Sequence, residues 1–231
     1  MGFIAESLKT ALTLILSLDQ EVFSAVWTSL GVASWSIIFA GLLGIPVGVA
    51  IGLLEFPLKR VAITVLNTLM GVPTVVIGIL VYSFLSRQGP LGFWGLLFTP
   101  KAMIVGQTLL AAPIVAAYTV TAIKAADWRI LPTAFTLGAG RMQSMAQLMR
   151  EARFGMMAAV VAGFGRVISE VGVAMMVGGN IRMYTRTMTT AIALETSKGE
   201  FATGLALGII LMAVALSVNL LLNALQQGRH A

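Results

Sequence analysis

Two charged residues one helical turn apart, Arg166 and Glu170, are the residues of this sequence best placed to do chemistry. They interrupt an otherwise uncharged apolar stretch, 154–181. Because residues four positions apart share a helical face, the two side chains can form an ion pair. A charge inside a bilayer is costly and rarely faces lipid. Two interpretations stay open: a neutralised pair that holds a helix bundle together, or an anion-attracting arginine or gate on a translocation path.

Most other catalytic and metal-binding chemistry is excluded by the residues present. The sequence has no Cys, and its one His, His230, is next to the last residue. Thiolate nucleophiles, clustered His ligands and Ser-His pairs are therefore ruled out, and we predict neither a catalytic nor a metal site. An intramembrane enzyme would depend on Ser, Asp or Glu, and Glu170 is the one acidic residue within the predicted spans.

The composition defines the class of protein. Of the 231 residues, 58% are hydrophobic and only 10% are charged, and the mean hydropathy is +0.94. Soluble domains carry about 25% charged residues, so this chain cannot cover the surface of a soluble fold of its size. We predict an all-α, polytopic membrane protein in contact with the lipid bilayer. The net charge of +6 then reflects orientation in the membrane, not binding to nucleic acid.

Five apolar segments are long enough to cross a bilayer as helices and together form a transmembrane domain over 22–228. The predicted spans are 26–54, 61–85, 102–123, 154–178 and 202–225. Small residues recur every four positions on the first span, which predicts a close contact between two helix backbones. These small residues are Ala40, Gly44, Gly48 and Gly52.

The second span contains its own interruption, at Gly71, Pro73 and Thr74. Proline removes a backbone donor and bends or breaks a helix. The interruption predicts either a structural kink or a break that lines a cavity on a translocation path.

The first 21 residues form a separate unit. Apolar residues recur at a helical period, with Glu6 and Lys9 on the other face, which predicts an amphipathic helix in the membrane interface. A short sixth span over 1–21 stays an alternative. Basic residues are concentrated in the segment 124–153, which the positive-inside rule places in the cytoplasm. We therefore expect the N-terminus outside and the C-terminus inside.

The segment 124–153 is long for a connector and contains a second amphipathic pattern. An apolar stripe rich in Met predicts a helix over about 133–148, and Met-rich faces suit adaptable protein contacts. Such a helix either lies on its own bilayer or docks into a groove of a cytoplasmic partner. The stripe consists of Ala134, Gly138, Met142, Met145 and Met149, with Leu137 and Leu148 beside it.

The residues 133–141 in this segment resemble the EAA loop of binding-protein-dependent ABC transporter permeases, with Gly138 at the glycine position of that motif. Pro132-Thr133-Ala134 stands where the family has Glu-Ala-Ala. Further segments are similar, in the same order, to molybdate-type oxyanion permeases, and the run from Ile181 to Gly199 is most similar to the tungstate branch. These further segments are 72–78, 89–92, 107–113, 165–172 and 178–181.

This resemblance implies a subunit of a type I importer in a bacterial or archaeal cytoplasmic membrane. It implies four partners: a second copy of the permease, two ABC ATPase subunits and an extracytoplasmic substrate-binding protein. ATP-Mg would be bound by the ATPase, with no cofactor in this chain, which lacks the GxxxxGK[ST] phosphate-binding motif. The residues that would contact the ATPase are Ala134, Leu137, Gly138, Arg141, Met142, Met145 and Leu148.

The remaining predicted sites lie at the outer face and within the spans. Arg182, Arg186 and Lys198 are expected outside, where they would dock the binding protein. Pro73, Thr74, Arg166 and Glu170 form the predicted path or gate. The expected function is ATP-driven import of an oxyanion, most similar to that of the tungstate permeases. The alternatives are a permease for molybdate or another anion, an ATP-independent secondary transporter, and a scaffold subunit that conducts nothing.

Overall fold

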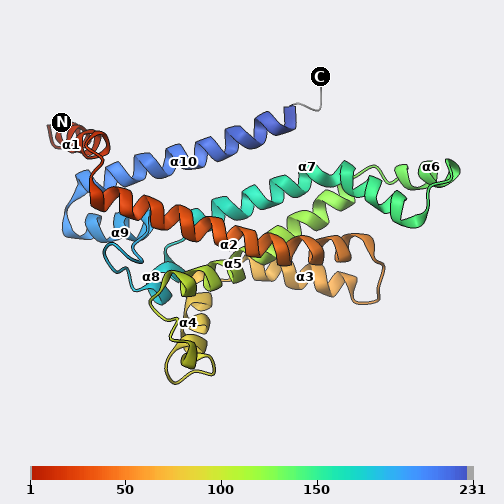
Figure 1. Cartoon of the computed structure of the whole chain (residues 1–231), viewed down its shortest axis with the longest axis horizontal. Coiled ribbons are helices and arrows are strands. Elements are labelled where there is room, and N and C mark those ends of the chain that lie inside the picture. The colour runs from red at the N-terminus through yellow and green to blue at the C-terminus, as the bar shows by residue number, and fades with distance from the viewer. Residues whose placement is uncertain (1, 228–231) are drawn as a thin grey trace.

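The computed structural model describes residues 2–227, and this part of the chain contains helices and no strand (Figure 1). His230 and the last residue of the predicted transmembrane domain, Gly228, lie outside the described residues. The elements are α1 (Gly2–Leu16), α2 (Gln20–Leu53), α3 (Lys59–Met70), α4 (Thr74–Leu85), the 3-10 helix η1 (Gly92–Trp94), α5 (Pro100–Ala125), α6 (Ile130–Thr136), α7 (Arg141–Ile168), α8 (Gly172–Gly178), α9 (Met188–Lys198) and α10 (Phe201–Gln227).

The number of apolar helices agrees with the predicted all-α membrane fold. Among residues 2–227, three helices, α2, α5 and α10, are long and apolar enough to cross a membrane, and two bent pairs bring the number to five if each pair is one span. The pair α3 and α4 is bent by 94°, and the pair α7 and α8 by 59°. The predicted spans 61–85 and 154–178 are therefore not continuous helices. The first break follows from Pro73, whereas the second, at 169–171, has no proline and was not predicted.

The bundle is held together by α2 and α5, which lie side by side. The predicted small-residue stripe on α2 faces α5 and is confirmed as a packing surface: a Cβ on Gly44 would come within 2.7 Å of Ala112 O, and one on Gly48 within 2.6 Å of Ala116 O. Without Cβ atoms the two backbones can approach closely and gain van der Waals contact along several turns. Pro46 lies within α2 without interrupting it.

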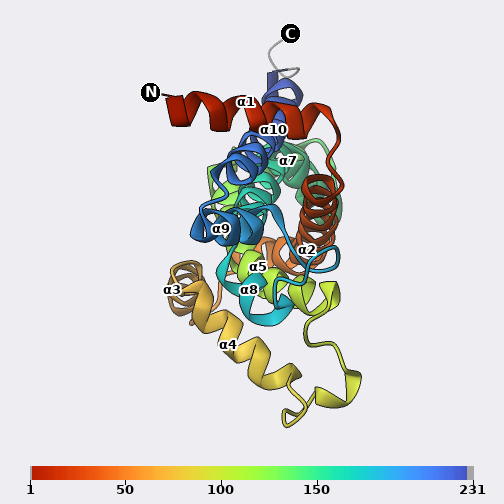
Figure 2. The same cartoon turned by 90° about the vertical axis from the view of Figure 1, so that its left-hand side faces the viewer.

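The bundle has two ends, and α6 lies at the end opposite to α9 and the start of α2 (Figure 1). α1 packs against α10 and runs across it (Figure 2). At 15 residues, α1 is about 22 Å long, shorter than the roughly 30 Å hydrocarbon core of a bilayer. In both views α4 and the loop after it project away from the bundle.

Candidate functional site

The breaks in the two bent helix pairs lie against each other. Pro73 precedes α4, whose first residue is Thr74, and Gly172 is the first residue of α8. A Cβ on Gly172 would come within 2.6 Å of Thr74 Oγ1. Gly78 keeps the two helices close further along, since a Cβ there would lie 3.1 Å from Met176 Cβ. The structure thus brings together candidate path residues from distant segments of the chain.

Glu170 holds the second break together. Its Oε2 accepts a hydrogen bond from Arg166 Nη1 at 2.9 Å, the ion pair expected from their spacing. Its Oε1 accepts from Val173 N at 3.1 Å, which satisfies a free backbone donor at the start of α8. Thr189 Oγ1 donates to the backbone oxygen of Glu170 at 2.7 Å. Glu170 is only 2% exposed, whereas the Arg166 side chain is 36% exposed. Loss of the Glu170 charge would leave Arg166 without its partner and the start of α8 without its acceptor.

The predicted coupling segment is not one helix. We expected a helix over about 133–148, but α6 ends at Thr136 and α7 begins at Arg141. Between them Gly138 has a φ of +83°, a left-handed conformation that ends a helix and favours glycine. From Arg141, α7 then continues without a break to Ile168.

The apolar stripe of this segment and the leucines beside it are divided between surface and interior. Leu137 and Met142 are 82% and 84% exposed, and Arg141 is exposed beside them. Leu148 is fully buried, so the expectation that it contacts a partner is corrected: it packs inside this chain. The half-buried members of the stripe are Ala134, Met145 and Met149.

Two local contacts fix the point at which the chain leaves α5 for α6. Trp128 Nε1 donates to Ile123 O at 3.2 Å, which ties the turn to the last turn of α5. Arg129 donates to both carboxylate oxygens of Asp127, with Nε to Oδ1 at 2.9 Å and Nη2 to Oδ2 at 3.0 Å. The hydrogen bond from Arg129 lowers the pKa of Asp127 from its ordinary value. This pair is exposed and precedes α6 directly.

At the opposite end of the bundle, the predicted docking residues take part in ion pairs. Glu21, in the first turn of α2, accepts from Arg182 Nη2 and Arg186 Nη1, both at 2.7 Å. Glu195, on α9, lies 3.0 Å from Lys198 Nζ and 3.5 Å from Arg186 Nη1. These five residues, the outer ion-pair network, tie the start of α2 to α9 and to the loop before it.

The three basic residues of the network differ in accessibility. The side chains of Arg182 and Lys198 are 66% and 50% exposed, whereas that of Arg186 is 11% exposed. Arg182 and Lys198 can therefore contact a partner directly. The expectation that Arg186 does so is corrected, because this side chain lies between two carboxylates of its own chain.

The sequence reasoning missed α9, in a region that we expected to be an outer loop. The signals for it are present: Thr187 Oγ1 accepts from Thr190 N at 3.3 Å at the start of α9, and Gly199 ends the helix with a φ of +87°. Glu21 and Glu195 were also missed as partners of the arginines. No sequence spacing could relate Glu21 to residues so far along the chain.

Residues 44–230 match the family described as "Binding-protein-dependent transport system inner membrane component". The match covers most of the chain, so the protein belongs to this family. The segment 133–141, which resembles the EAA loop, lies within the matched residues. The class of protein is a membrane subunit of a binding-protein-dependent transport system.

Relatives extend this likeness over the full length. The chain is 40% identical to the "Tungstate uptake system permease protein TupB" of Peptoclostridium acidaminophilum over 98% of this chain and 100% of that protein. The protein of the same name from Campylobacter jejuni is 40% identical over 98% of this chain and 95% of that one. The predicted similarity to the tungstate branch of the permeases is confirmed.

Solved structures share the fold. An inward-facing structure of the MetNI methionine ABC transporter superposes with a TM-score of 0.75, covering 92% of this chain and 97% of that chain at 17% identity. At this identity the likeness shows the helical architecture alone. It confirms the predicted all-α permease fold.

Proposed function

We propose that this chain is the membrane permease subunit of an ATP-driven importer whose cargo is tungstate, with molybdate or another tetrahedral anion as the alternative. The observation that carries the proposal is the 40% identity to two tungstate uptake permeases over 98% of the chain. The proposed membrane is the cytoplasmic membrane of a bacterium or archaeon.

The proposed assembly contains two copies of this permease, two ABC ATPase subunits and an extracytoplasmic substrate-binding protein. Dependence on a binding protein is stated in the family description. The chemistry of ATP hydrolysis, with ATP-Mg, belongs to the ATPase subunits, because this sequence has no phosphate-binding GxxxxGK[ST] loop. This chain is thus not itself an enzyme, and it holds no cofactor of its own.

Coupling to the ATPase is assigned to α6 and the first turn of α7. Exposed Leu137 and Met142 offer apolar contact, and Arg141 offers a polar contact at the edge. Because α7 runs from this surface into the membrane as one helix, a displacement of its start is carried to the break near Glu170. Gly138 gives α6 its own direction relative to α7. This end of the bundle is the proposed cytoplasmic side, with the N-terminus outside and the C-terminus inside.

The translocation path is assigned to the region where the two helix breaks meet. Thr74 and Glu170 lie on opposite elements there, and Arg166 brings the positive charge that an oxyanion requires. Broken helices at membrane depth are tolerated where they are buried in protein or line a cavity. A shift of α8 relative to α4 would change this contact, and ATP binding would bias it through α7.

Docking of the loaded binding protein is assigned to Arg182 and Lys198, held in place by Glu21 and Glu195. We expect Arg182→Glu to reduce the stimulation of ATP hydrolysis by the loaded binding protein, because reversed charge repels a complementary acidic surface. Arg60→Glu, at the opposite end, is the matched control for an exposed charge reversal. Unchanged stimulation by Arg182→Glu would remove the docking assignment.

The decisive experiment is reconstitution. The permease is purified with its ATPase, placed in liposomes and supplied with the binding protein, and uptake of tungstate, molybdate and sulfate is measured with and without ATP. ATP-dependent uptake with tungstate preferred is the expected result. Uptake without ATP would favour a secondary transporter, preferred uptake of molybdate would change the cargo, and ATPase binding without any uptake would favour a scaffold subunit.

A further inference from the structure

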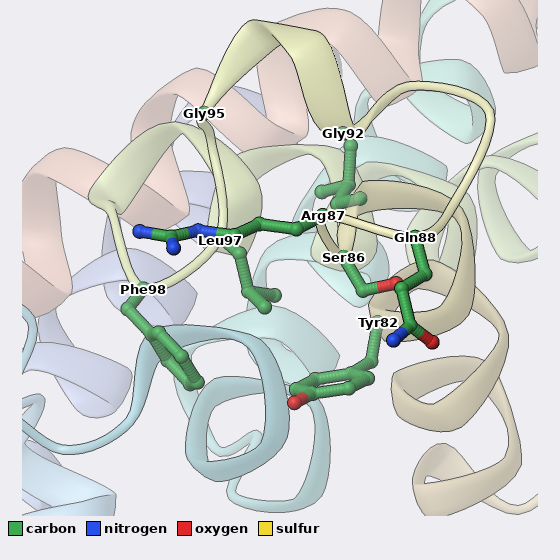
Figure 3. A pocket seen from close by; sticks show the side chains of 9 residues that line it. Tyr82, Ser86, Arg87, Gln88, Gly92, Gly95, Leu97 and Phe98 are labelled. Carbon is green, nitrogen blue, oxygen red and sulfur yellow. The ribbon is translucent and has the colours of Figure 1, made fainter.

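A pocket with polar side chains in its lining lies outside the sites discussed so far. It is formed by the end of α4 and the loop that leads to α5, with a volume of about 620 Å³. Figure 3 shows Arg87 extending from the end of α4 towards Leu97 and Phe98, with Gln88 on the opposite side and Tyr82 below. None of these residues belongs to the proposed path, coupling surface or docking surface.

The walls of this pocket are fixed by the fold. Gly89 and Gly92 press against the backbone oxygens of Ser83 and Ser86, where a Cβ on either glycine would collide. The loop is therefore folded tightly back onto the last turn of α4. A side chain at either glycine would force it open.

The far wall is held by Phe98. Its N–H donates to Val177 O at 2.9 Å, its ring packs edge-to-face on Tyr82 with centroids 6.2 Å apart, and it lies close against Gly179. Phe98 also has a φ of +61°, a strained conformation for a bulky residue that persists only where surrounding contacts enforce it. The pocket is thus anchored to the end of α8.

The chemistry of the pocket is that of an anion site. Arg87 is the one residue with a full charge among those that line it, and the sequence has no Asp or Glu between Glu55 and Asp127. Within residues 2–227, Arg87 has no ion pair, and the hydroxyl of Tyr82 and the amide of Gln88 have no hydrogen-bond partner. The lining thus carries one exposed guanidinium and, at other points of the same pocket, two neutral donors. These groups match the acceptor oxygens of a tetrahedral oxyanion.

We propose that this pocket, the Arg87 pocket, binds a tetrahedral oxyanion. Two sources share this chemistry: the free cargo anion and the phosphate of a phospholipid headgroup. Exposed Phe93 and Trp94 lie in η1, between the lining residues Gly92 and Gly95. A tryptophan in this position also suits a membrane interface. The tungstate source rests on the proposed function, whereas the lipid source does not.

The test uses the purified full-length chain in a phosphate-free maltoside detergent, in two arms. One arm measures tungstate bound at equilibrium dialysis, and the other counts phospholipid that stays bound, by native mass spectrometry. We expect Arg87→Gln to raise the apparent Kd about tenfold or more in at least one arm, since it removes a charge-assisted hydrogen bond. Lys101→Gln, an exposed cation that does not line the pocket, is the matched control and should behave as the unaltered chain.

A second variant keeps the charge. Tyr82→Phe removes one hydroxyl and should weaken binding in the same arm by a smaller factor, about threefold to tenfold. If Arg87→Gln does not fold, Tyr82→Phe decides whether the pocket binds an oxyanion. Loss in the tungstate arm assigns the site to free anion, and loss in the lipid arm alone assigns it to headgroup phosphate. No change in either arm, or an equal loss with Lys101→Gln, overturns the proposal. Arg87-dependent tungstate binding without ATP-driven uptake would leave the site standing and reject the proposed function.

Discussion

The two ends of the helix bundle use their charged residues differently. At the proposed outer end, Glu21 and Glu195 hold three basic side chains within the chain's own ion-pair network. At the proposed cytoplasmic end, five exposed basic residues have no ion pair within residues 2–227. They are Arg60, Lys124, Arg141, Arg150 and Arg153.

This difference separates charges that build the protein from charges that await a partner. Arg186 fixes the loop before α9 to α2 and is scarcely accessible, whereas Arg141 stands at the exposed junction between α6 and α7 and has no ion pair with an acidic residue of the described chain. A count of basic residues on each side of the membrane does not distinguish Arg186 from Arg141. Of these two arginines, Arg186 contributes to the fold, and Arg141 is available for the proposed ATPase partner.

The largest effect is expected between the two ends, at the pair Arg166 and Glu170. Glu170→Gln should lower the free energy of unfolding by about 3 kcal/mol, because the buried carboxylate loses both its ion pair with Arg166 and its charged hydrogen bond to the start of α8. The thermal unfolding of the purified protein in detergent measures this. Arg166→Gln combined with Glu170→Gln should recover part of the loss. Normal stability with altered transport would instead make the pair a gate with no structural role.

At the outer end, Arg186→Gln should cost about 2 kcal/mol, since two partly buried carboxylates lose a shared partner. The matched substitution at the inner end, Arg141→Gln, should change stability by less than about 0.5 kcal/mol. Chemical unfolding of both variants under the same conditions compares them. Similar losses of stability in Arg186→Gln and Arg141→Gln would show that the basic residues of the two ends do not differ in their contribution to the fold.

The left-handed turn between α6 and α7 can be tested with a substitution that changes no charge. Gly138→Ala should destabilise by about 1 kcal/mol, because alanine disfavours a positive φ although nothing lies within 4 Å of the added Cβ. Gly208→Ala also places its Cβ in open space, but within α10, so it should be neutral or stabilising. Equal unfolding temperatures for the two variants would show that the left-handed turn is not needed.

For Arg141→Glu we expect a small effect on stability and a large one on coupling. In the reconstituted assembly, the stimulation of ATP hydrolysis by the loaded binding protein should fall about tenfold, because the charge at a proposed contact to the ATPase is reversed. Arg150→Glu, on the same helix, tests whether any nearby reversal does the same. Full stimulation in Arg141→Glu would take Arg141 out of the coupling surface.

The smallest effect concerns pH at the inner end. Because Arg129 lowers the pKa of Asp127, the pair stabilises the turn above the ordinary pKa of an aspartate, and this contribution is lost as the pH falls through the lowered value. The carboxyl chemical shift of Asp127 should titrate below that of a free aspartate, and Arg129→Gln should move it back. An unchanged titration in Arg129→Gln would contradict the pairing.

Local sequence patterns predicted much of the architecture because their causes are local. The apolar lengths gave the spans, Pro73 gave the first break, and the spacing of Arg166 and Glu170 gave their ion pair. The glycine stripe on α2 predicted a close helix contact, although it could not name α5 as the partner. The break of the coupling segment at Gly138 was missed because the apolar stripe continues across this residue. The spacing of apolar residues does not show that one residue between them has a left-handed conformation.

By itself, the sequence determined the class of protein: a membrane-embedded helix bundle with too few charges for a soluble surface. The tertiary structure decided which residues meet. It brought Thr74 to Gly172 and Glu170, paired Glu21 with arginines more than 160 positions away, buried Leu148, and gathered Arg87 and its neighbours around a pocket. These outcomes depend on how helices pack and where loops fold back, and contacts between distant segments leave no spacing pattern in one sequence.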